Sequence, residues 1–176
     1  MIRPATPEDV PAIIDMIRGL AEYERALERV ETSAEQLHDA LFGAAPAVFC
    51  HIAAAGEGGE EVAGFALWFV SYSTWLGRHG IHLEDLFVHP DHRGRGYGVQ
   101  LLAALAQVCV ERGYGRFEWS VLDWNTPAVE FYRSLGAVSL DEWIPYRLTG
   151  PALERLAARD SPPPRLSGRS RPEPTR

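Results

Sequence analysis

The sequence predicts an α/β protein with a mixed, mostly antiparallel sheet flanked by helices. Apolar runs of strand length alternate along the chain with segments whose apolar residues recur at helical spacing. Two of the strand-like runs are separated only by a short Gly/Glu turn, which is typical of an antiparallel hairpin. Later strand-like runs are separated by a helix, and such pairs run parallel with a right-handed crossover.

The first half of the chain is predicted to form two helices and the hairpin. Thr6 is followed by Pro and two acidic residues, which favours the start of a helix. The apolar residues after it recur at helical spacing, and the hydroxyl of Thr32 or Ser33 is placed to cap a second helix. The predicted elements are a short apolar start at residues 2–5, helices from residue 6 to about 20 and from 32 or 33 to about 42, and strands at residues 47–55 and 62–72.

The second half alternates strands and helices. Gly113 and Gly136 each follow a helical pattern and are expected to end it. The predicted elements are strands at residues 80–89 and 116–122, helices at residues 96–112 and 125–135, and one or two further strands within residues 137–148. The first of these helices is expected to turn Val99, Leu102, Leu105, Ala106 and Cys109 inward.

Charge and composition exclude several classes of partner. The 176 residues fit one domain, and 17 basic residues, all Arg, against 24 acidic residues give a net charge of −7. Nucleic acids and anionic membranes need a basic face, so we expect neither as a partner. The sequence has no apolar run of ~18 residues, and because its first residues contain no apolar stretch we do not expect them to be a signal peptide. Cys50 and Cys109 lie in apolar runs without zinc-like spacing, which indicates a cytoplasmic protein with reduced core cysteines and no metal.

The end of the chain differs in composition from the rest. Residues 161–176 are rich in Pro and Arg, and Leu166 is their one large aliphatic residue. Such a segment buries too little apolar surface to offset its ordering entropy, so we expect a disordered tail after one folded domain of residues 1–160. That domain holds 13 Arg against 23 acidic residues, a net charge of −10.

A glycine-rich turn at residues 92–98 follows a predicted strand and opens a predicted helix. Its three glycines permit backbone conformations that a Cβ forbids, so successive N–H groups can face one concavity. At a helix N-terminus such a concavity favours an anion, and two Arg side chains add positive charge. The alternative is a tight strand-to-helix turn with exposed Arg. The residues concerned are Arg93, Gly94, Arg95, Gly96, Tyr97 and Gly98.

Two familiar phosphate-binding motifs do not match this turn. A P-loop ends in Gly-Lys-Ser/Thr, and the chain contains no Lys. The dinucleotide fingerprint has GxGxxG early in a βαβ unit, whereas GxGxG stands here beyond the middle of the chain.

The pattern Arg-x-x-Gly-x-Gly after a strand ending near Val-x-Pro resembles the acetyl-CoA site of the GNAT superfamily of N-acetyltransferases. Arg93, Gly96 and Gly98 fill this pattern, and the resemblance extends over residues 1–148. It implies two central parallel strands that splay apart, with acetyl-CoA in the cleft and its pyrophosphate on the turn. The pantetheine arm would pair with the backbone of Leu86, Phe87 and Val88.

Several fragments are similar to the diamine (spermidine/spermine) acetyltransferase subfamily, and Tyr-Ser-Thr-Trp at residues 72–75 is more similar to its thialysine-acetylating branch. The other fragments lie at residues 2–6, 20–24, 83–88, 123–125 and 131–132. This narrower resemblance implies a homodimer that acetylates a small cationic amine. The polyamine branch has an acid before Pro-Trp where Ser73-Thr74-Trp75 stands here, which favours a smaller, lysine-like acceptor.

Acetyl transfer to an amine needs groups that move protons. An alkylamine has a pKa of about 10 and must lose a proton before it attacks a thioester. The resemblance implies that Glu84 accepts this proton through water and that Tyr132 protonates the departing thiolate. From the residues alone, Glu84 also fits the solvated face of an edge strand, and Tyr132 a core aromatic. Asn125 fits a helix N-cap, and the resemblance places it near the pantetheine arm.

The acceptor site is implied by resemblance, and acids with aromatic rings suit a cationic amine. Asp85 would bind a second ammonium group of the acceptor. The other residues implied to line the site are Tyr23, Glu24, Thr74, Trp75, Glu142 and Trp143. His82, His89 and His92 flank the site and are expected to be surface or strand residues.

Two alternatives to a small-amine acetyltransferase stay open at this point. A protein acetyltransferase acting on N-termini or lysines would need an open peptide groove. A regulator that binds acyl-CoA without catalysis would not need both Glu84 and Tyr132.

Overall fold

The computed structural model describes residues 1–160, so the predicted tail at residues 161–176 lies outside the described residues. The chain divides into two compact units, Met1–Asn125 and a second unit that begins at Thr126. That residues 1–160 form one domain stays a prediction. Within the described part of the chain, no helix is both long enough and apolar enough to cross a membrane.

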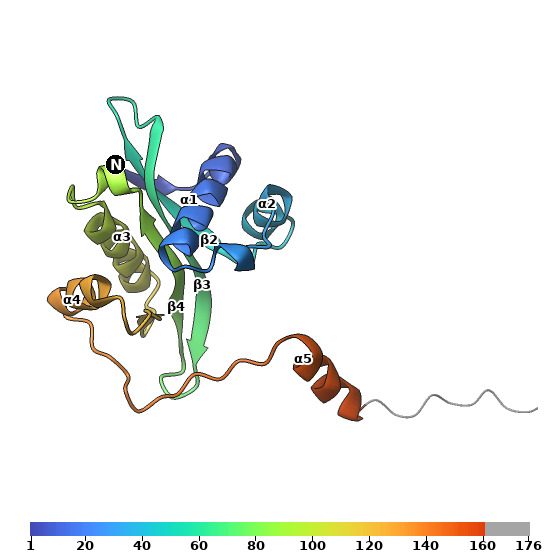
Figure 1. The fold of residues 1–176 in the computed structure, drawn as a ribbon. Helices are drawn as coiled ribbons and strands as arrows, with labels where there is room; N and C mark the ends of the chain where they lie inside the picture. The colour runs from blue at the N-terminus through green and yellow to red at the C-terminus, as the bar shows by residue number, and fades with distance from the viewer. Residues whose placement is uncertain (161–176) are drawn as a thin grey trace, which may run out of the picture. The chain divides into compact units, whose positions relative to one another are not determined.

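The first unit is built on a five-stranded sheet whose strands lie in chain order (Figure 1). The first three neighbouring pairs are antiparallel, whereas β4 and β5 are parallel. This confirms the predicted mixed, mostly antiparallel sheet. The strands are β1 (Ile2–Pro4), β2 (Phe49–Ala55), β3 (Glu61–Ser73), β4 (Arg78–Val88) and β5 (Phe117–Trp119).

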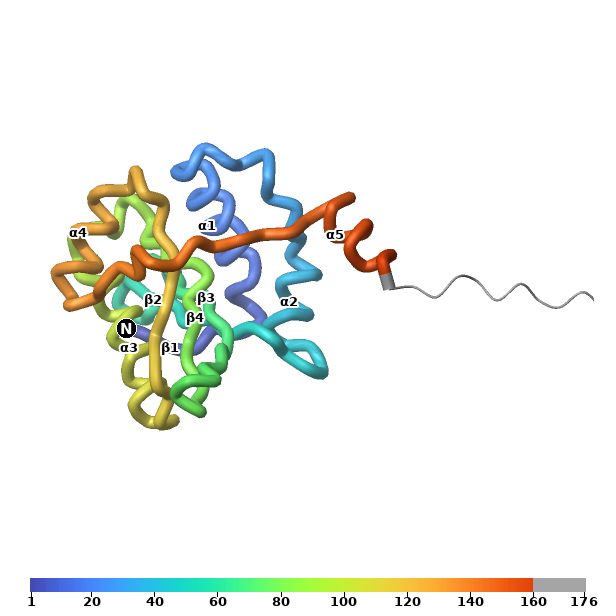
Figure 2. Tube along the Cα trace, turned by 90° about the horizontal axis from the view of Figure 1, so that it is seen from below, coloured from blue at the N-terminus to red at the C-terminus, as the bar shows by residue number. Residues whose placement is uncertain are grey.

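Helices of the first unit cover both faces of the sheet, with α1 and α2 on one face and α3 on the other (Figure 1 and Figure 2). Ile13 of α1 and Leu37 of α2 share a buried cluster with Phe65 and Phe87 of the sheet. The helices are α1 (Val10–Tyr23), α2 (Ala34–Phe42) and α3 (Tyr97–Glu111), with 3-10 turns at Pro7–Asp9, Leu27–Arg29 and Pro90–His92.

The helix ends follow the predicted signals. The Ser33 Oγ accepts a hydrogen bond from the Gln36 N–H at 3.1 Å, and the Gln36 side chain accepts one from the Ser33 N–H at 2.8 Å. Of the two predicted caps, Thr32 and Ser33, it is therefore Ser33 that starts α2, with a reciprocal capping box. Gly113, predicted to stop the long helix, follows the C-cap Arg112 with a φ of 65°.

The buried face of α3 differs from the predicted one. Val99 is 43% exposed and Ala106 is exposed as well, so the prediction that they face inward is wrong. Leu101, absent from the predicted set, is fully buried. The stripe that meets the sheet runs through residues 101, 105 and 109, which lie four apart and so share one helix face. The buried residues of α3 are Leu101, Leu102, Leu105 and Cys109.

The parallel strands separate partway along β4. Their pairing ends at Leu83 and Trp119, whereas β4 continues to Val88. The strand predicted at residues 116–122 is therefore shorter than expected, because residues 120–122 have left the sheet. Residues 84–88, the open edge of β4, have no β5 partner, and their backbone groups on that side can pair with a ligand.

A register irregularity lies where the open edge begins. Leu67 of β3 pairs with Asp85, but the next residue, Trp68, pairs with Leu83, so Glu84 is left out of the pairing. An extra residue of this kind is a β-bulge, which re-aims side chains and increases the local twist. The two adjacent acids thus stand at a bulge rather than in a regular strand.

The second unit contains α4 (Thr126–Ser134), α5 (Gly150–Ala157) and a 3-10 turn at Ala158–Asp160. Gly136 follows α4 with a φ of 86°, as predicted for a glycine stop. The prediction of strands within residues 137–148 is wrong, because the structure has no strand there. β-propensity yields a strand only where a neighbour covers one face, and Trp143 and Tyr146 are 63% and 92% exposed.

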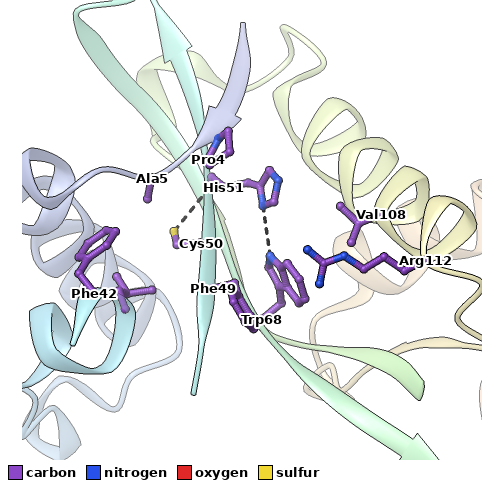
Figure 3. Close-up of a pocket in the computed structure, with 10 residues that line it drawn as sticks. Pro4, Ala5, Phe42, Phe49, Cys50, His51, Trp68, Val108 and Arg112 are labelled. Atoms are coloured by element: carbon purple, nitrogen blue, oxygen red, sulfur yellow. Dashed lines mark hydrogen bonds between the residues drawn. The ribbon is translucent and has the colours of Figure 1, made fainter. Parts of the chain in front are cut away.

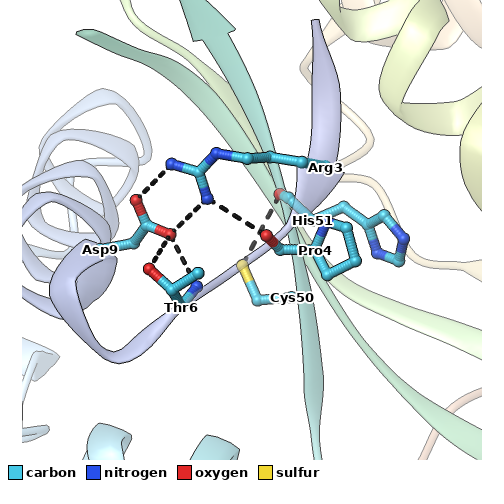
Figure 4. A network of polar contacts seen from close by, with 6 residues as sticks. All are labelled: Arg3, Pro4, Thr6, Asp9, Cys50 and His51. Atoms are coloured by element: carbon cyan, nitrogen blue, oxygen red, sulfur yellow. Dashed lines mark hydrogen bonds and ion pairs between the residues drawn. The ribbon is translucent and has the colours of Figure 1, made fainter. Parts of the chain in front are cut away.

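An ion pair fixes the start of the chain to the start of α1 (Figure 4). The Arg3 guanidinium donates to both carboxylate oxygens of Asp9, at 2.6 and 2.7 Å, and the Thr6 N–H donates to the same carboxylate at 2.7 Å. The Asp9 side chain is 7% exposed. The hydrogen bond from Arg3 is the main reason why the pKa of Asp9 lies below its ordinary value.

Replacing Arg3 with Met is expected to lower the free energy of unfolding by about 2–4 kcal/mol, because the buried Asp9 carboxylate loses its charged partner. Urea unfolding at pH 7 measures this loss. Since the pKa of Asp9 is lowered, the contribution of the pair is present above the ordinary pKa of Asp and is lost as the pH falls through the lowered value.

The matched control is Arg18→Met. Arg18 pairs with Asp15 at 3.7 Å, and both side chains are mostly exposed. The control should cost less than about 0.5 kcal/mol. Equal losses in the two variants would contradict a special role for the Arg3–Asp9 pair.

Candidate active site

The glycine-rich turn joins the end of β4 to the start of α3. Gly94 and Gly96 have φ values of 76° and 78°, which favour glycine because a Cβ is strained in this conformation. Gly96 is the N-cap of α3, and the Gln100 N–H donates to its carbonyl oxygen at 3.0 Å. The N–H groups before Gln100 therefore have no acceptor within the helix and are available to an anion.

The two Arg side chains of the turn lie in different surroundings. The Arg93 Nε donates to the Val88 carbonyl at 3.1 Å. Its guanidinium carbon lies 5.6 Å from the ring centre of Tyr23 and 5.7 Å from that of Phe87, which is cation–π geometry. Both Arg residues are exposed, but these contacts hold Arg93 against β4 and α1, whereas Arg95 lies between the turn glycines.

His92 differs from the expectation of a surface or strand residue. It is buried in the 3-10 turn, and its Nε2 lies 3.1 Å from an oxygen of Glu61 on β3. This contact anchors the turn to the neighbouring hairpin. His82 is a strand residue stacked on Phe69 at 4.9 Å, as expected, and His89 is exposed.

Asp85 is a partly buried acid on the face of β4 that α1 covers. It lies two residues before Phe87, so both side chains point to the same face of the strand. The pKa of Asp85 is raised to about 6, chiefly by burial and then by the nearby charges of Glu84 and Glu24. Glu24 is the C-cap of α1, and burial raises its pKa as well. Such a group of repelling carboxylates favours a bound cation.

The end of α1 also meets the loop after β5. The Tyr23 hydroxyl donates to the Oδ1 of Asn125 at 3.1 Å, and the Tyr23 ring centre lies 6.0 Å from that of Trp124. Trp124 belongs to the Asp-Trp-Asn fragment, but no role was predicted for it. Its place beside Asn125 is the signal that could have drawn attention to it.

The remaining predicted residues belong to the tip of the β3–β4 hairpin or to the second unit. Thr74 and Trp75 stand at the tip of the β3–β4 hairpin, where Trp75 is 89% exposed. The strand from Arg78 to Asp85 separates this tip from the acids by roughly 20 Å at about 3.3 Å per residue. Tyr132, Glu142 and Trp143 belong to the second unit, in which the Tyr132 ring centre lies 5.3 Å from that of Phe131.

A pocket of about 320 Å³ lies at the start of β2 and contains none of the predicted site residues (Figure 3). The Trp68 Nε1 donates to the His51 Nδ1 across it at 3.1 Å. Burial, followed by the charge of Arg112, lowers the pKa of His51. The lowered pKa and the hydrogen bond to Nδ1 both favour the neutral form of the half-buried His51. Across residues 1–160, no group of three or more His, Cys, Asp or Glu is placed to hold a metal ion.

The open edge of β4 and the glycine-rich turn suit the two parts of an acyl-CoA. An amide arm can pair with the open edge, and phosphates can meet the free N–H groups of the turn at the end of the same strand. This fold and site define the chain as an N-acetyltransferase. The chain belongs to the acetyltransferase (GNAT) family, whose model matches residues 14–137.

Known proteins are similar to the chain over nearly its whole length. It is 40% identical over 167 residues to thialysine N-epsilon-acetyltransferase of Sus scrofa, across 90% of this chain and 98% of the relative. It is 32% identical over 197 residues to L-ornithine N5-acetyltransferase NATA1 of Arabidopsis thaliana, across 88% and 86%. An integron cassette protein of V. cholerae has a similar structure, with a TM-score of 0.72 and 27% identity, across 89% of this chain and 96% of that one.

Proposed function

We propose that the protein transfers the acetyl group of acetyl-CoA directly to the primary amine of a small cationic acceptor. The acceptor class comprises diamines, polyamines and lysine-like amino acids. The observation that carries this proposal is the partly buried pair Asp85 and Glu24 beside the open edge of β4. The family and the names of the relatives support it, since thialysine and ornithine are both amino acids with a side-chain amine.

The donor would lie along β4 and end at the turn. Backbone groups of Leu86, Phe87 and Val88 hold the pantetheine arm, and the turn from Arg93 to Gly98 holds the pyrophosphate. Asn125 stands beside the arm, on the loop after β5. When bound, acetyl-CoA supplies the acetyl group as a thioester.

The chemistry assigned to the chain consists of proton movements at the nitrogen and at the sulfur. Glu84 takes one proton of the acceptor ammonium through water, which frees the nitrogen lone pair. The N–C bond forms, the C–S bond breaks, and Tyr132 protonates the departing thiolate. The nitrogen then releases its second proton, which leaves a neutral amide and restores the Tyr132 phenol. The exposed position of Glu84 at the bulge supports access to water, since its side chain is not part of the regular strand pairing.

A smaller acceptor is favoured over a long polyamine. Ser73-Thr74-Trp75 lacks the acid of the polyamine branch, and the Ser73 Oγ accepts a hydrogen bond from the Leu76 N–H within the hairpin turn. Glu24 and Asp85 remain as acids for the distal charge of the acceptor. Tyr23, Glu142 and Trp143 complete the proposed acceptor set.

We further propose a homodimer. The hairpin tip with Thr74 and Trp75 is separated along β4 from Asp85 of the same chain. A second copy that brings its hairpin tip to the acids would complete the acceptor site. The 89% exposure of Trp75 supports a surface that another chain covers.

An amine panel tests the acceptor class. Thialysine, lysine and ornithine are expected to accelerate CoA release more than putrescine, and putrescine more than spermidine, because the proposed site suits a short acceptor. CoA is measured with a thiol reagent, to which the buried Cys50 and Cys109 contribute little. Because the chain has no Lys, side-chain self-acetylation cannot imitate an acetylated product.

The other outcomes separate the alternatives. Acetylation of a lysine peptide with none of the small amines would support a protein acetyltransferase. Tight CoA binding without acceleration by any amine or peptide would support a non-catalytic regulator. Either result would overturn the small-amine assignment.

A further inference from the structure

Tyr23 connects the two segments that border the open edge of β4. Its hydroxyl donates to the Asn125 Oδ1 at 3.1 Å, on the loop after β5. On its other side, the Arg93 guanidinium carbon lies 5.6 Å from its ring centre, at the start of the glycine-rich turn. One side chain at the end of α1 therefore contacts both segments.

Both of these contacts are with residues proposed to hold acetyl-CoA, although Tyr23 itself is predicted for the acceptor site. Arg93 stands at the phosphate end and Asn125 beside the arm. The β4–β5 pairing ends at Leu83 and Trp119, so the sheet does not fix how far apart the following segments stand. Tyr23 spans them from outside the sheet.

Helix α1, which carries Tyr23, is held in place by close packing on β4. A Cβ at Gly19 of α1 would lie 3.2 Å from the Phe87 Cζ, so α1 packs closely on β4 about one turn before Tyr23. Phe87 in turn lies 5.7 Å from the Arg93 guanidinium carbon. Tyr23 is 41% exposed, so its contacts contribute little to the buried core.

Resting on the proposed function, we propose that Tyr23 is a positioning residue for acetyl-CoA. It holds the Asn125 carboxamide and Arg93 at a fixed distance from each other. This keeps the open edge of β4 accessible, so that the pantetheine arm can bind without a rearrangement of the two segments. Preorganisation of this kind lowers the ordering cost of binding, so its loss weakens donor affinity rather than the chemical step.

Tyr23→Phe removes the hydroxyl and keeps the ring over Arg93. The dissociation constant of CoA, measured by calorimetry, is expected to rise about 3- to 10-fold, the loss of one hydrogen bond. The KM for acetyl-CoA should rise equally, and by more than the acceptor KM, because the ring that is proposed to line the acceptor site stays in place. The matched control is Tyr114→Phe, whose hydroxyl contacts Arg112 at 3.5 Å at the other end of α3 and whose loss should leave all these constants unchanged.

A double-mutant cycle tests whether Tyr23 acts through Asn125. In an Asn125→Ala background, Tyr23→Phe should cause no further change in the dissociation constant of CoA. Additive effects would overturn the proposal. A lower melting temperature of Tyr23→Phe with unchanged CoA affinity would also overturn it. So would tighter CoA binding by this variant, which would mean that Tyr23 obstructs the open edge of β4. Failure of the unmodified protein to bind CoA would instead refute the proposed function.

Discussion

Replacing Tyr132 with Phe is expected to lower kcat about 100- to 1,000-fold while leaving the dissociation constant of CoA unchanged. The phenol is proposed to protonate the departing thiolate, and a benzene ring cannot. The substitution keeps the ring, so the contact with Phe131 at 5.3 Å and the hydrogen bond from the Leu135 N–H to the Tyr132 carbonyl at 3.1 Å both remain. The loss should therefore appear in the chemical step alone.

Single-turnover kinetics and CoA calorimetry separate the two effects. The matched control is Tyr146→Phe, in the same unit, where the side chain is 92% exposed. Tyr146→Phe should change neither kcat nor the dissociation constant of CoA. A parallel loss of CoA affinity in Tyr132→Phe would mean that the residue supports binding, and an unchanged kcat would mean that the thiolate takes its proton from elsewhere.

Local signals predicted much of the fold because they are encoded within a few residues. The Ser33 cap, the hairpin turn and the glycine after α4 each depend on adjacent residues, and each appears where expected. Features that depend on distant partners were predicted less well. The strands expected within residues 137–148 failed because a strand needs a neighbour that the sequence does not specify.

In the candidate site, too, features encoded by neighbouring residues were predicted and features that depend on distant residues were not. The glycine-rich turn and the adjacent acids Glu84 and Asp85 are visible as motifs. The bulge that separates the roles of these acids depends on the register between β3 and β4, which no local pattern records. The bond from Tyr23 to Asn125 joins residues 102 positions apart. Contacts of this kind come from topology rather than from spacing.

Asp85→Asn is expected to stabilise the fold and weaken the enzyme at the same time. Burial and the charges of Glu84 and Glu24 raise the pKa of Asp85 to about 6, so at pH 7.5 the folded protein holds an unfavourable charge. Removing that charge should raise the free energy of unfolding by about 1–3 kcal/mol. Residues kept despite such a cost are typical of functional sites.

The raised pKa of Asp85 makes the free energy of unfolding depend on pH. Between its ordinary pKa and about 6, Asp85 keeps a proton in the folded chain that the unfolded chain releases. Wild-type stability therefore falls as the pH rises through this range, and the penalty is complete above it. Thermal unfolding of Asp85→Asn and wild type should differ at pH 7.5 and converge near pH 4. Asp15→Asn, at an exposed site, is the control and should show no such difference.

The same carboxylate is proposed to hold the distal charge of the acceptor, so the acceptor KM of Asp85→Asn should rise about 10-fold or more, the loss of a charged hydrogen bond. In the wild type, the acceptor KM should rise as the pH falls through about 6, because protonation removes the charge. Glu24→Gln removes one of the charges that raise the pKa of Asp85, so this inflection should move to lower pH. If the acceptor KM changes neither in Asp85→Asn nor with pH, Asp85 does not bind the acceptor. Its charge would then lower the stability of the fold without a role in acceptor binding.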